Sequence, residues 1–152
     1  YASSFLYHQL PAGALKRLMR IMDHSSIYIL IAGSYTPVLL YMGTPLAYGY
    51  AAGMWIAALL GIFLTTKYWG KLYVLHIALY AAMGWSILSV WPQVYPLLPD
   101  GLFPYLIAGG ITYTSGILFY GMKRIPHNHF IWHLFVLAGS IIFFAGYAIF
   151  LI

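Results

Sequence analysis

Residues 127–152 have the sequence HNHFIWHLFVLAGSIIFFAGYAIFLI, an apolar run that opens with closely spaced histidines. A run of this kind is long enough for an α-helix to cross the ~30 Å hydrocarbon core of a membrane. His129 and His133 are one helical turn apart, and at ~100° per residue their side chains point only about 40° apart. The stretch therefore predicts a spanning helix that offers two ligands to one metal ion near its start.

The composition of the whole chain is typical of integral membrane proteins. Of its 152 residues, 63% are hydrophobic and 6% are charged, whereas about a quarter of the residues in a typical soluble domain are charged. A soluble chain of this size leaves roughly 30% of its unfolded surface in water, too much for so apolar a sequence. The chain has no Cys, so a metal site has to use His, Asp, Glu or hydroxyl ligands.

Hydropathy along the chain predicts an all-α, polytopic transmembrane helical bundle. A spanning helix needs ~20 apolar residues, whereas strands of a membrane barrel are about ten residues of alternating polarity. The sequence opens at Tyr1 inside an apolar run, so we expect a fragment that lacks its amino-terminal portion and begins in a partial helix. We expect one domain, 1–152, with the partial helix at 1–10, a basic segment at 11–22 and full spans at 23–41, 46–66, 72–91, 103–122 and 127–152.

The basic residues predict how the bundle is oriented. They fall only in alternate connections, and the positive-inside rule places these connections in the cytoplasm. We therefore expect the carboxyl terminus to lie on the non-cytoplasmic side of the membrane. The net charge of +5 is explained by this topology and by contact with anionic lipid, without nucleic acid. The basic residues are Lys16, Arg17 and Arg20 in the first connection, Lys67 and Lys71 in the third, and Lys123 and Arg124 in the fifth.

The same topology predicts that polar side chains from separate segments meet at one membrane depth. His8 ends the partial helix, Asp23 begins the next helix, and His129 and His133 begin the last one. Ser4 lies one turn from His8 on the same helical face. Ionisable groups within a membrane are costly unless they pair, bind a metal or line water, so we expect a functional site here.

Three histidines with one open position are typical of catalytic zinc, whereas structural zinc usually has four protein ligands. Zinc lowers the pKa of a water ligand to about 7 and so provides a nucleophile near neutral pH. We predict that His8, His129 and His133 bind Zn²⁺ and that Asp23 hydrogen-bonds the water or takes its proton. Ser4 is predicted to hydrogen-bond the water or a developing oxyanion.

Each of these residues, taken singly, also has a purely structural explanation. Asp23 has the position of a helix N-cap, Ser4 could bond back to its own helix, and His8 could be an interfacial histidine. Histidines four residues apart, such as His129 and His133, also occur without a metal. The metal hypothesis depends on all of these residues lying together at the same membrane depth.

The remaining histidines receive weaker assignments. His24 and His127 are expected at the water boundary, where either could replace one of the chosen ligands. His76 lies near the start of its span and is assigned no role. Small residues at helical spacing predict close packing of helices and no chemistry; they are Gly49 with Gly53, Ala57 with Gly61, and Gly116 beside Ser115.

The motifs in this order resemble those of the bacterial hemolysin III proteins, which belong to one superfamily with the adiponectin and progestin receptors. The resemblance covers essentially the whole chain, and the combination of Ser-x-x-x-His, Asp and His-x-x-x-His is far more specific than any single motif. The segments that carry it are SFLYH (4–8), DHSSIY (23–28), IAGSYTP (31–37), MGW (83–85) and HFIWHLF (129–135).

The resemblance implies a seven-helix bundle of which this chain lacks the first helix and most of the second. It implies a cytoplasm-facing zinc bound by His8, His129 and His133, with Ser4 and Asp23 near the zinc-bound water. The receptors of the superfamily resemble ceramidases in architecture, and the bacterial branch was named for haemolysis and is linked to membrane homeostasis.

Two classes of function follow. The first is a zinc-dependent membrane hydrolase acting on a lipid amide or related acyl bond, with membrane lipids as its partners. The second is a pore-forming, cytolytic or membrane-homeostasis protein in which zinc is structural. The open metal position favours the hydrolase, and none of the full spans carries the polar stripe that a water-filled pore would need.

Overall fold

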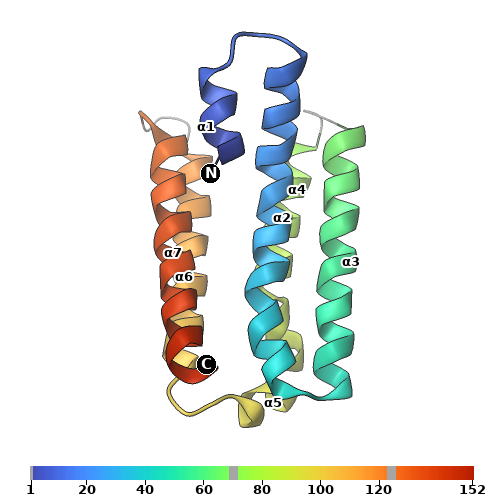
Figure 1. Cartoon of the computed structure of the whole chain (residues 1–152), viewed down its shortest axis with the longest axis vertical. Helices are drawn as coiled ribbons and strands as arrows, with labels where there is room; N and C mark the ends of the chain where they lie inside the picture. The colour runs from blue at the N-terminus through green and yellow to red at the C-terminus, as the bar shows by residue number, and fades with distance from the viewer. Residues whose placement is uncertain (1, 69–71, 123–125) are drawn as a thin grey trace.

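The computed structural model describes residues 2–68, 72–122 and 126–152, and this part of the chain is an all-α bundle without strands (Figure 1). The predicted fold class is confirmed. The helices are α1 (Ala2–Gln9), α2 (Ala14–Met42), α3 (Pro45–Lys67), α4 (Tyr73–Trp85), the 3₁₀ helix η1 (Ser86–Val90), α5 (Trp91–Val94), the 3₁₀ helix η2 (Tyr95–Leu97), α6 (Phe103–Gly121) and α7 (Asn128–Phe150).

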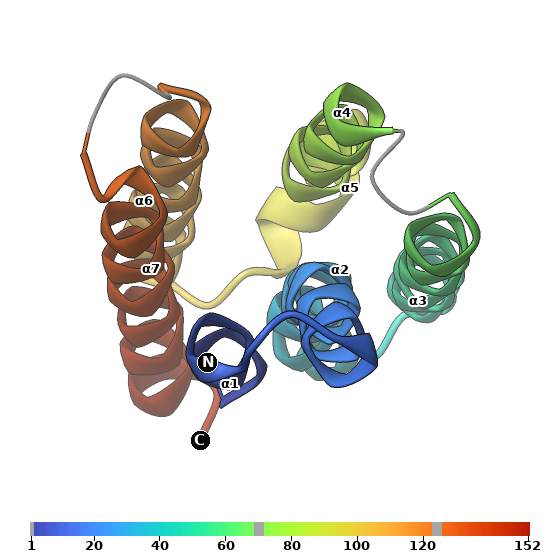
Figure 2. The same ribbon diagram turned by 90° about the horizontal axis from the view of Figure 1, so that it is seen from above.

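Long apolar helices account for the membrane assignment. Among the described residues, four stretches are long and apolar enough to cross a bilayer, namely Ala14–Met42, Pro45–Lys67, Val74–Leu97 and Asn128–Phe150. α6 adds a further helix of 19 residues that runs alongside α7 in both views (Figures 1 and 2). Large apolar side chains cover the outside of the bundle, as lipid contact requires; Val74, Phe144 and Leu59 are 77%, 70% and 64% exposed.

α2 begins at Ala14, well before the predicted start of the first full span at residue 23. Lys16, Arg17 and Arg20 therefore lie on the same helix as Asp23, and the predicted separate basic segment is wrong. Lys, Arg, Leu and Met are good helix formers, and nothing between 14 and 23 breaks a helix. The lower hydropathy before residue 23 therefore does not mark a break between a separate segment and the helix.

This longer helix also corrects the N-cap interpretation of Asp23. The cap position of α2 is Gly13, which supplies no side-chain hydrogen bond. Asp23 lies inside the helix and is buried. Its carboxylate is thus available to the bundle interior.

The third predicted span, 72–91, is only partly one regular helix. α4 ends at Trp85, and the chain continues to Leu97 through η1, α5 and η2. Pro92 and Pro96 lack an N–H group and interrupt regular helix. The hydroxyl of Ser86 donates to the Met83 carbonyl oxygen at 2.7 Å, a local bond that competes with helical hydrogen bonding.

α1 lies between α2 and α7 in both views (Figures 1 and 2). A short turn joins it to α2, and Lys16 Nζ donates to the Leu10 carbonyl oxygen across this turn at 2.9 Å. α1 therefore presents Ser4 to the first turns of α7, where His129 and His133 lie.

Glycines set how closely neighbouring helices approach. A Cβ atom added at Gly116 would lie 2.7 Å from Phe135 Cβ, and one added at Gly61 would enter the Tyr28 ring. The packing role predicted for these two glycines is confirmed. The prediction for Gly49 and Gly53 is wrong, because no described atom lies within 4 Å of a Cβ added there.

We expect Gly139→Leu to lower the free energy of unfolding by about 1–3 kcal/mol, the usual cost of overpacking. A Cβ at Gly139 would lie 2.5 Å from the Tyr113 ring, whose hydroxyl pairs with Ser140 Oγ at 2.9 Å. Thermal unfolding in detergent measures the effect. The matched control is Gly49→Leu at an exposed position with open space; equal unfolding temperatures for the two variants would contradict this packing account.

The basic residues that the structure describes gather at one end of the bundle. Lys16, Arg17 and Arg20 lie in the first two turns of α2, and Lys67 ends α3 beside them (Figure 1). Lys71, Lys123 and Arg124 lie outside the described residues. Which side of the membrane this end faces stays a prediction.

Candidate metal centre

Three helices that are distant in sequence bring polar side chains to one point. Ser4 Oγ of α1 lies 2.7 Å from His133 Nε2 of α7. His133 Nε2 lies 3.1 Å from His129 Nε2 on the same helix. Asp23 Oδ2 of α2 lies 4.0 Å from His129 Nε2. The structure therefore brings these four of the five residues predicted to meet to one point, while their predicted roles stay predictions.

Asp23, His129 and His133 form a group that could bind a metal ion, because one ligand atom from each lies within 4.8 Å of the others. A tetrahedral zinc with Zn–N distances of 2.0–2.1 Å places neighbouring ligand atoms about 3.3 Å apart. The separation of 3.1 Å between the two imidazole nitrogens fits this geometry. Asp23, at 4.0 Å, lies farther away and leaves room for a bridging group.

The burial of Asp23 supports the same conclusion. Its side chain is 9% exposed, and a carboxylate inside a bundle is costly unless it pairs or binds a cation. The distance of 4.0 Å to His129 is too long for a direct hydrogen bond. A cation held between Asp23 and the imidazoles would offset the cost of burying the carboxylate.

His8 lies beside this group but is not one of its three members. It occupies the last turn of α1, and its ring centroid is 5.0 Å from that of His129, with 59° between the ring planes. Its side chain is more exposed than that of His129. The assignment of His8 as a metal ligand stays a prediction.

In the structure, Ser4 contacts the imidazole of His133. The sequence predicted that it contacts a water or an oxyanion. Its side chain is buried, and its hydroxyl lies where the nitrogens of His129 and His133 converge. The alternative that Ser4 only bonds back to its own helix is not what the structure shows. The hydroxyl is close enough to interact with a third group held at this point.

The two histidines predicted as alternative ligands lie outside the metal-binding group. His24 Nδ1 pairs with the Arg20 carbonyl oxygen at 2.9 Å, one turn away on α2. His127 is exposed at the position preceding α7, with a φ of 58°. Neither belongs to the group formed by Asp23, His129 and His133.

A cavity of about 310 Å³ opens next to the metal-binding group, between α2, α4, α6 and α7. Asp23, His129 and His133 line it, and His76 and Tyr80 of α4 contribute to its wall. Trp132 is buried in the same wall. The group therefore has space beside it for a further molecule.

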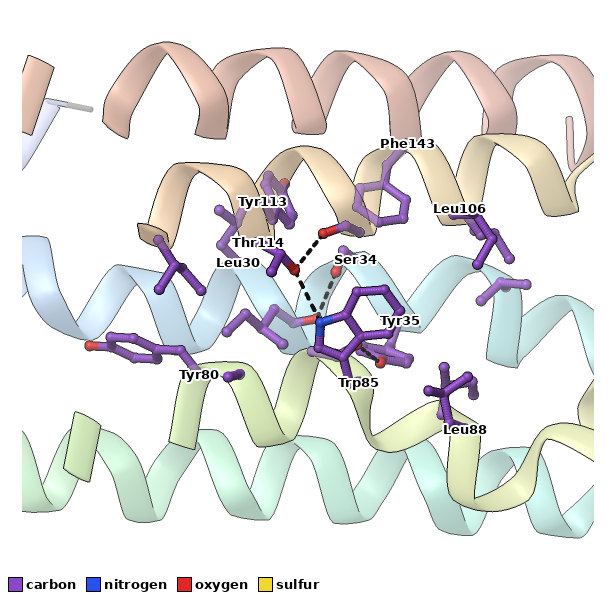
Figure 3. Close-up of a pocket in the computed structure, with 18 of the residues that line it drawn as sticks. Leu30, Ser34, Tyr35, Tyr80, Trp85, Leu88, Leu106, Tyr113, Thr114 and Phe143 are labelled. Atoms are coloured by element: carbon purple, nitrogen blue, oxygen red, sulfur yellow. Dashed lines mark hydrogen bonds between the residues drawn. The ribbon is translucent and has the colours of Figure 1, made fainter. Parts of the chain in front are cut away.

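A second cavity of about 130 Å³ continues deeper into the bundle (Figure 3). Its wall is almost entirely apolar or aromatic, and the labelled side chains of Leu30, Trp85 and Phe143 show its character in Figure 3. Trp85 Nε1 donates to Thr114 Oγ1 at 3.0 Å, which satisfies the indole N–H inside this wall. The two cavities share the lining residues Ile27, Leu30, Tyr80, Ile117, Trp132 and Val136.

Sequence reasoning missed several aromatic or imidazole side chains at this site. His76 and Trp132 line the cavity, and the Tyr120 ring lies 5.7 Å from that of His129. Tyr28 lies behind His76, with its hydroxyl 2.7 Å from His76 Nδ1. The only signal for His76 was an ionisable residue within an apolar span, which by itself indicates a functional position.

Comparison with known proteins gives one consistent result. The family model described as "Haemolysin-III related" matches residues 1–144. "Hemolysin-3" of Bacillus cereus is 39% identical over 95% of this chain, and the "Hemolysin-3 homolog" of Bacillus subtilis (strain 168) is 40% identical over 92%. The human "Monocyte to macrophage differentiation factor" is 33% identical over 83% of the chain.

The chain spans 66% of the length of each of the two Bacillus proteins and 52% of the human protein. No solved structure matches it.

Proposed function

This chain belongs to the haemolysin-III-related family of membrane proteins, and on that premise we propose that it is a zinc-dependent hydrolase of a lipid amide or related acyl bond. One observation carries the proposal. Two imidazole nitrogens and a buried carboxylate converge beside an internal cavity that continues into an apolar one. This arrangement combines a hydrolytic centre with space for a lipid chain.

His129 and His133 would hold the metal through Nε2, since their separation of 3.1 Å suits neighbouring zinc ligands. His8 is the third ligand in this proposal, because its ring lies beside that of His129. Zinc bound by neutral nitrogens supplies Lewis acidity and an acidified water near neutral pH. The mixture of nitrogen and carboxylate donors also suits zinc better than calcium or magnesium, which prefer oxygen ligands.

Two polar side chains would accept the proton and hydrogen-bond the substrate. Asp23 lies 4.0 Å from His129 Nε2, a distance that favours a role as proton acceptor over direct ligation. Ser4, with its hydroxyl at the point of convergence, would hydrogen-bond the oxygen that becomes negative as the acyl bond is attacked. These two residues are therefore the proposed catalytic residues.

The cavities favour an amphiphilic substrate. Arg20 and His24 of α2 line the polar cavity with the metal-binding group, while the deeper cavity offers apolar and aromatic side chains to an acyl chain. Membrane lipids are the proposed partners, with the site at the basic, cytoplasmic end of a bacterial plasma-membrane protein. The carboxyl terminus would then lie on the non-cytoplasmic side.

Cytolysis is the second candidate, favoured by the names of the Bacillus relatives. In that case the protein would form a pore or alter membrane properties, and a metal would only stabilise the bundle. The apolar lining of the deeper cavity is unsuited to a water-filled path.

One experiment separates the two functions. The purified protein is placed in liposomes that contain a trapped dye and a lipid amide with a labelled acyl chain. The proposal predicts release of labelled fatty acid without dye leakage, and loss of this release in His133→Ala. Dye leakage that persists in His133→Ala, with no acyl release from either protein, would establish the cytolytic alternative.

We expect Ser4→Ala to reduce the release of fatty acid about 100-fold, the usual cost of losing one donor to a developing oxyanion. Zinc affinity should stay near that of the wild type, because Ser4 Oγ lies 2.7 Å from His133 Nε2, the atom that would bind the metal, and cannot hydrogen-bond that nitrogen once it is a ligand. Fatty-acid release and competition with a fluorescent zinc chelator measure the two quantities. The matched control is Ser89→Ala, which removes an exposed hydroxyl bonded to the Ser86 carbonyl oxygen; equal turnover in the two variants would exclude the catalytic role.

A further inference from the structure

His76 of α4 lines the same cavity as the metal-binding group but is not a member of that group. Its Nδ1 atom is engaged by the Tyr28 hydroxyl at 2.7 Å. Nε2 is therefore the ring nitrogen left to interact with a molecule in the cavity. An imidazole that lines a cavity and has one nitrogen occupied can use the other nitrogen to recognise a ligand.

Tyr28 is itself held firmly in place. Its side chain is fully buried, and its ring packs over Gly61 of α3, where even one added Cβ atom would clash. On the other side its ring lies 4.6 Å from the Tyr80 ring, and the Tyr80 hydroxyl donates to the His24 carbonyl oxygen at 3.0 Å. Three helices therefore fix the direction from which the Tyr28 hydroxyl approaches His76.

The direction of the hydrogen bond between Tyr28 and His76 decides what His76 presents to the cavity. A neutral imidazole has one N–H donor and one acceptor nitrogen. When the Tyr28 hydroxyl donates to Nδ1, the proton of the ring resides on Nε2. His76 then offers a hydrogen-bond donor to the cavity, opposite in character to the carboxylate of Asp23.

We propose that His76 recognises the polar head of the lipid by donating its Nε2–H to a head-group oxygen, with Tyr28 as the positioning residue. The inference rests on the proposed function in one respect, that the cavity beside the metal holds the lipid head. It adds a specificity: the lipid needs an oxygen acceptor, such as a hydroxyl, next to the acyl bond. A head group without that oxygen leaves the donor unsatisfied.

Binding of two matched probes tests the proposal without turnover. The probes are an N-acylethanolamine and the corresponding N-acylethylamine, which lacks the hydroxyl, each with a brominated acyl chain. Bromine quenches the fluorescence of Trp85 and Trp132, which line the cavities. The zinc-loaded wild-type protein should bind the ethanolamide about 3- to 10-fold more tightly, as expected for one hydrogen bond.

Two substitutions of His76 separate recognition from packing. The amide nitrogen of His76→Gln can take the place of Nε2, whereas the shorter side chain of His76→Asn reaches only the position of Nδ1. We expect His76→Gln to keep most of the preference for the hydroxyl and His76→Asn to lose it. The reverse order, or an unchanged preference in both variants, would show that His76 only supports Tyr28 and would overturn the proposal.

The role of Tyr28 is tested by a matched pair of Tyr→Phe variants. Tyr28→Phe keeps the ring but removes the hydroxyl, so the preference should fall about 2- to 5-fold. Tyr50→Phe is the control, because the buried Tyr50 hydroxyl has no hydrogen-bond partner among the described residues and lines neither cavity. Nitrogen-15 NMR of the His76 ring should show the Nε2–H tautomer in the wild type; an Nδ1–H tautomer would contradict the inference.

The outcomes also distinguish this inference from the proposed hydrolysis. If the wild type prefers the ethanolamide but releases no fatty acid, the hydrolytic function fails and the recognition by His76 stands. If fatty acid is released without any preference for the hydroxyl, the hydrolysis stands and the role of His76 fails.

Discussion

Asp23→Asn is expected to leave the metal in place and to reduce the release of fatty acid by about 100- to 10,000-fold, the usual contribution of a general base. The asparagine side chain has nearly the same size and shape but cannot accept a proton. Because Asp23 lies 4.0 Å from His129 Nε2, its replacement should remove the proton acceptor without removing a metal ligand. Metal content and turnover are measured on the same preparation.

The chain offers a well-matched control for this prediction. Asp23 and Asp100 are its only acidic residues, and Asp100 lies in the turn that precedes α6. Asp100→Asn makes the same chemical change outside the site and should preserve turnover. An Asp23→Asn protein that loses its metal would identify Asp23 as a ligand, and one with undiminished turnover would remove it from the mechanism.

His8→Ala is expected to weaken zinc binding by more than about 100-fold, because loss of a direct ligand should exceed the 10- to 100-fold effect of outer-shell partners. The His8 ring centroid lies 5.0 Å from that of His129, which makes His8 the candidate for the third ligand. Zinc affinity is measured by chelator competition, with turnover as a second readout.

The control for His8 is another exposed imidazole near the same end of the bundle. His127→Asn removes that imidazole but keeps a residue type that tolerates a φ of 58°. Its zinc affinity should equal that of the wild type. Equal affinity in His8→Ala would leave His129 and His133 without a third histidine ligand and would refute the three-histidine site.

Much of the fold could be predicted from sequence because each spanning helix has to be apolar over its whole length. The last span was predicted at 127–152, and α7 runs from Asn128 to Phe150. Hydropathy failed where helix and membrane do not coincide. α2 begins at Ala14 and so includes Arg20, ahead of the apolar stretch. α4 is followed by the short helices η1, α5 and η2 before the span is complete.

The site could be predicted only in part, for a geometric reason. Helical spacing alone predicts that His129 and His133 lie on the same face of the helix, and the structure places their Nε2 atoms 3.1 Å apart. The contact of Ser4 with His133 depends on α1 packing between α2 and α7, which no local pattern encodes. The pair of Tyr28 and His76 is 48 residues apart in sequence and depends on the packing of three helices.

The central claim is that His129 and His133 of α7 bind a zinc ion, and metal analysis of the purified protein tests it most directly. We predict about one zinc per chain in the wild type and essentially none in the double variant His129→Ala, His133→Ala, with both proteins folded by circular dichroism. Zinc retained at the wild-type stoichiometry in the double variant would contradict the claim.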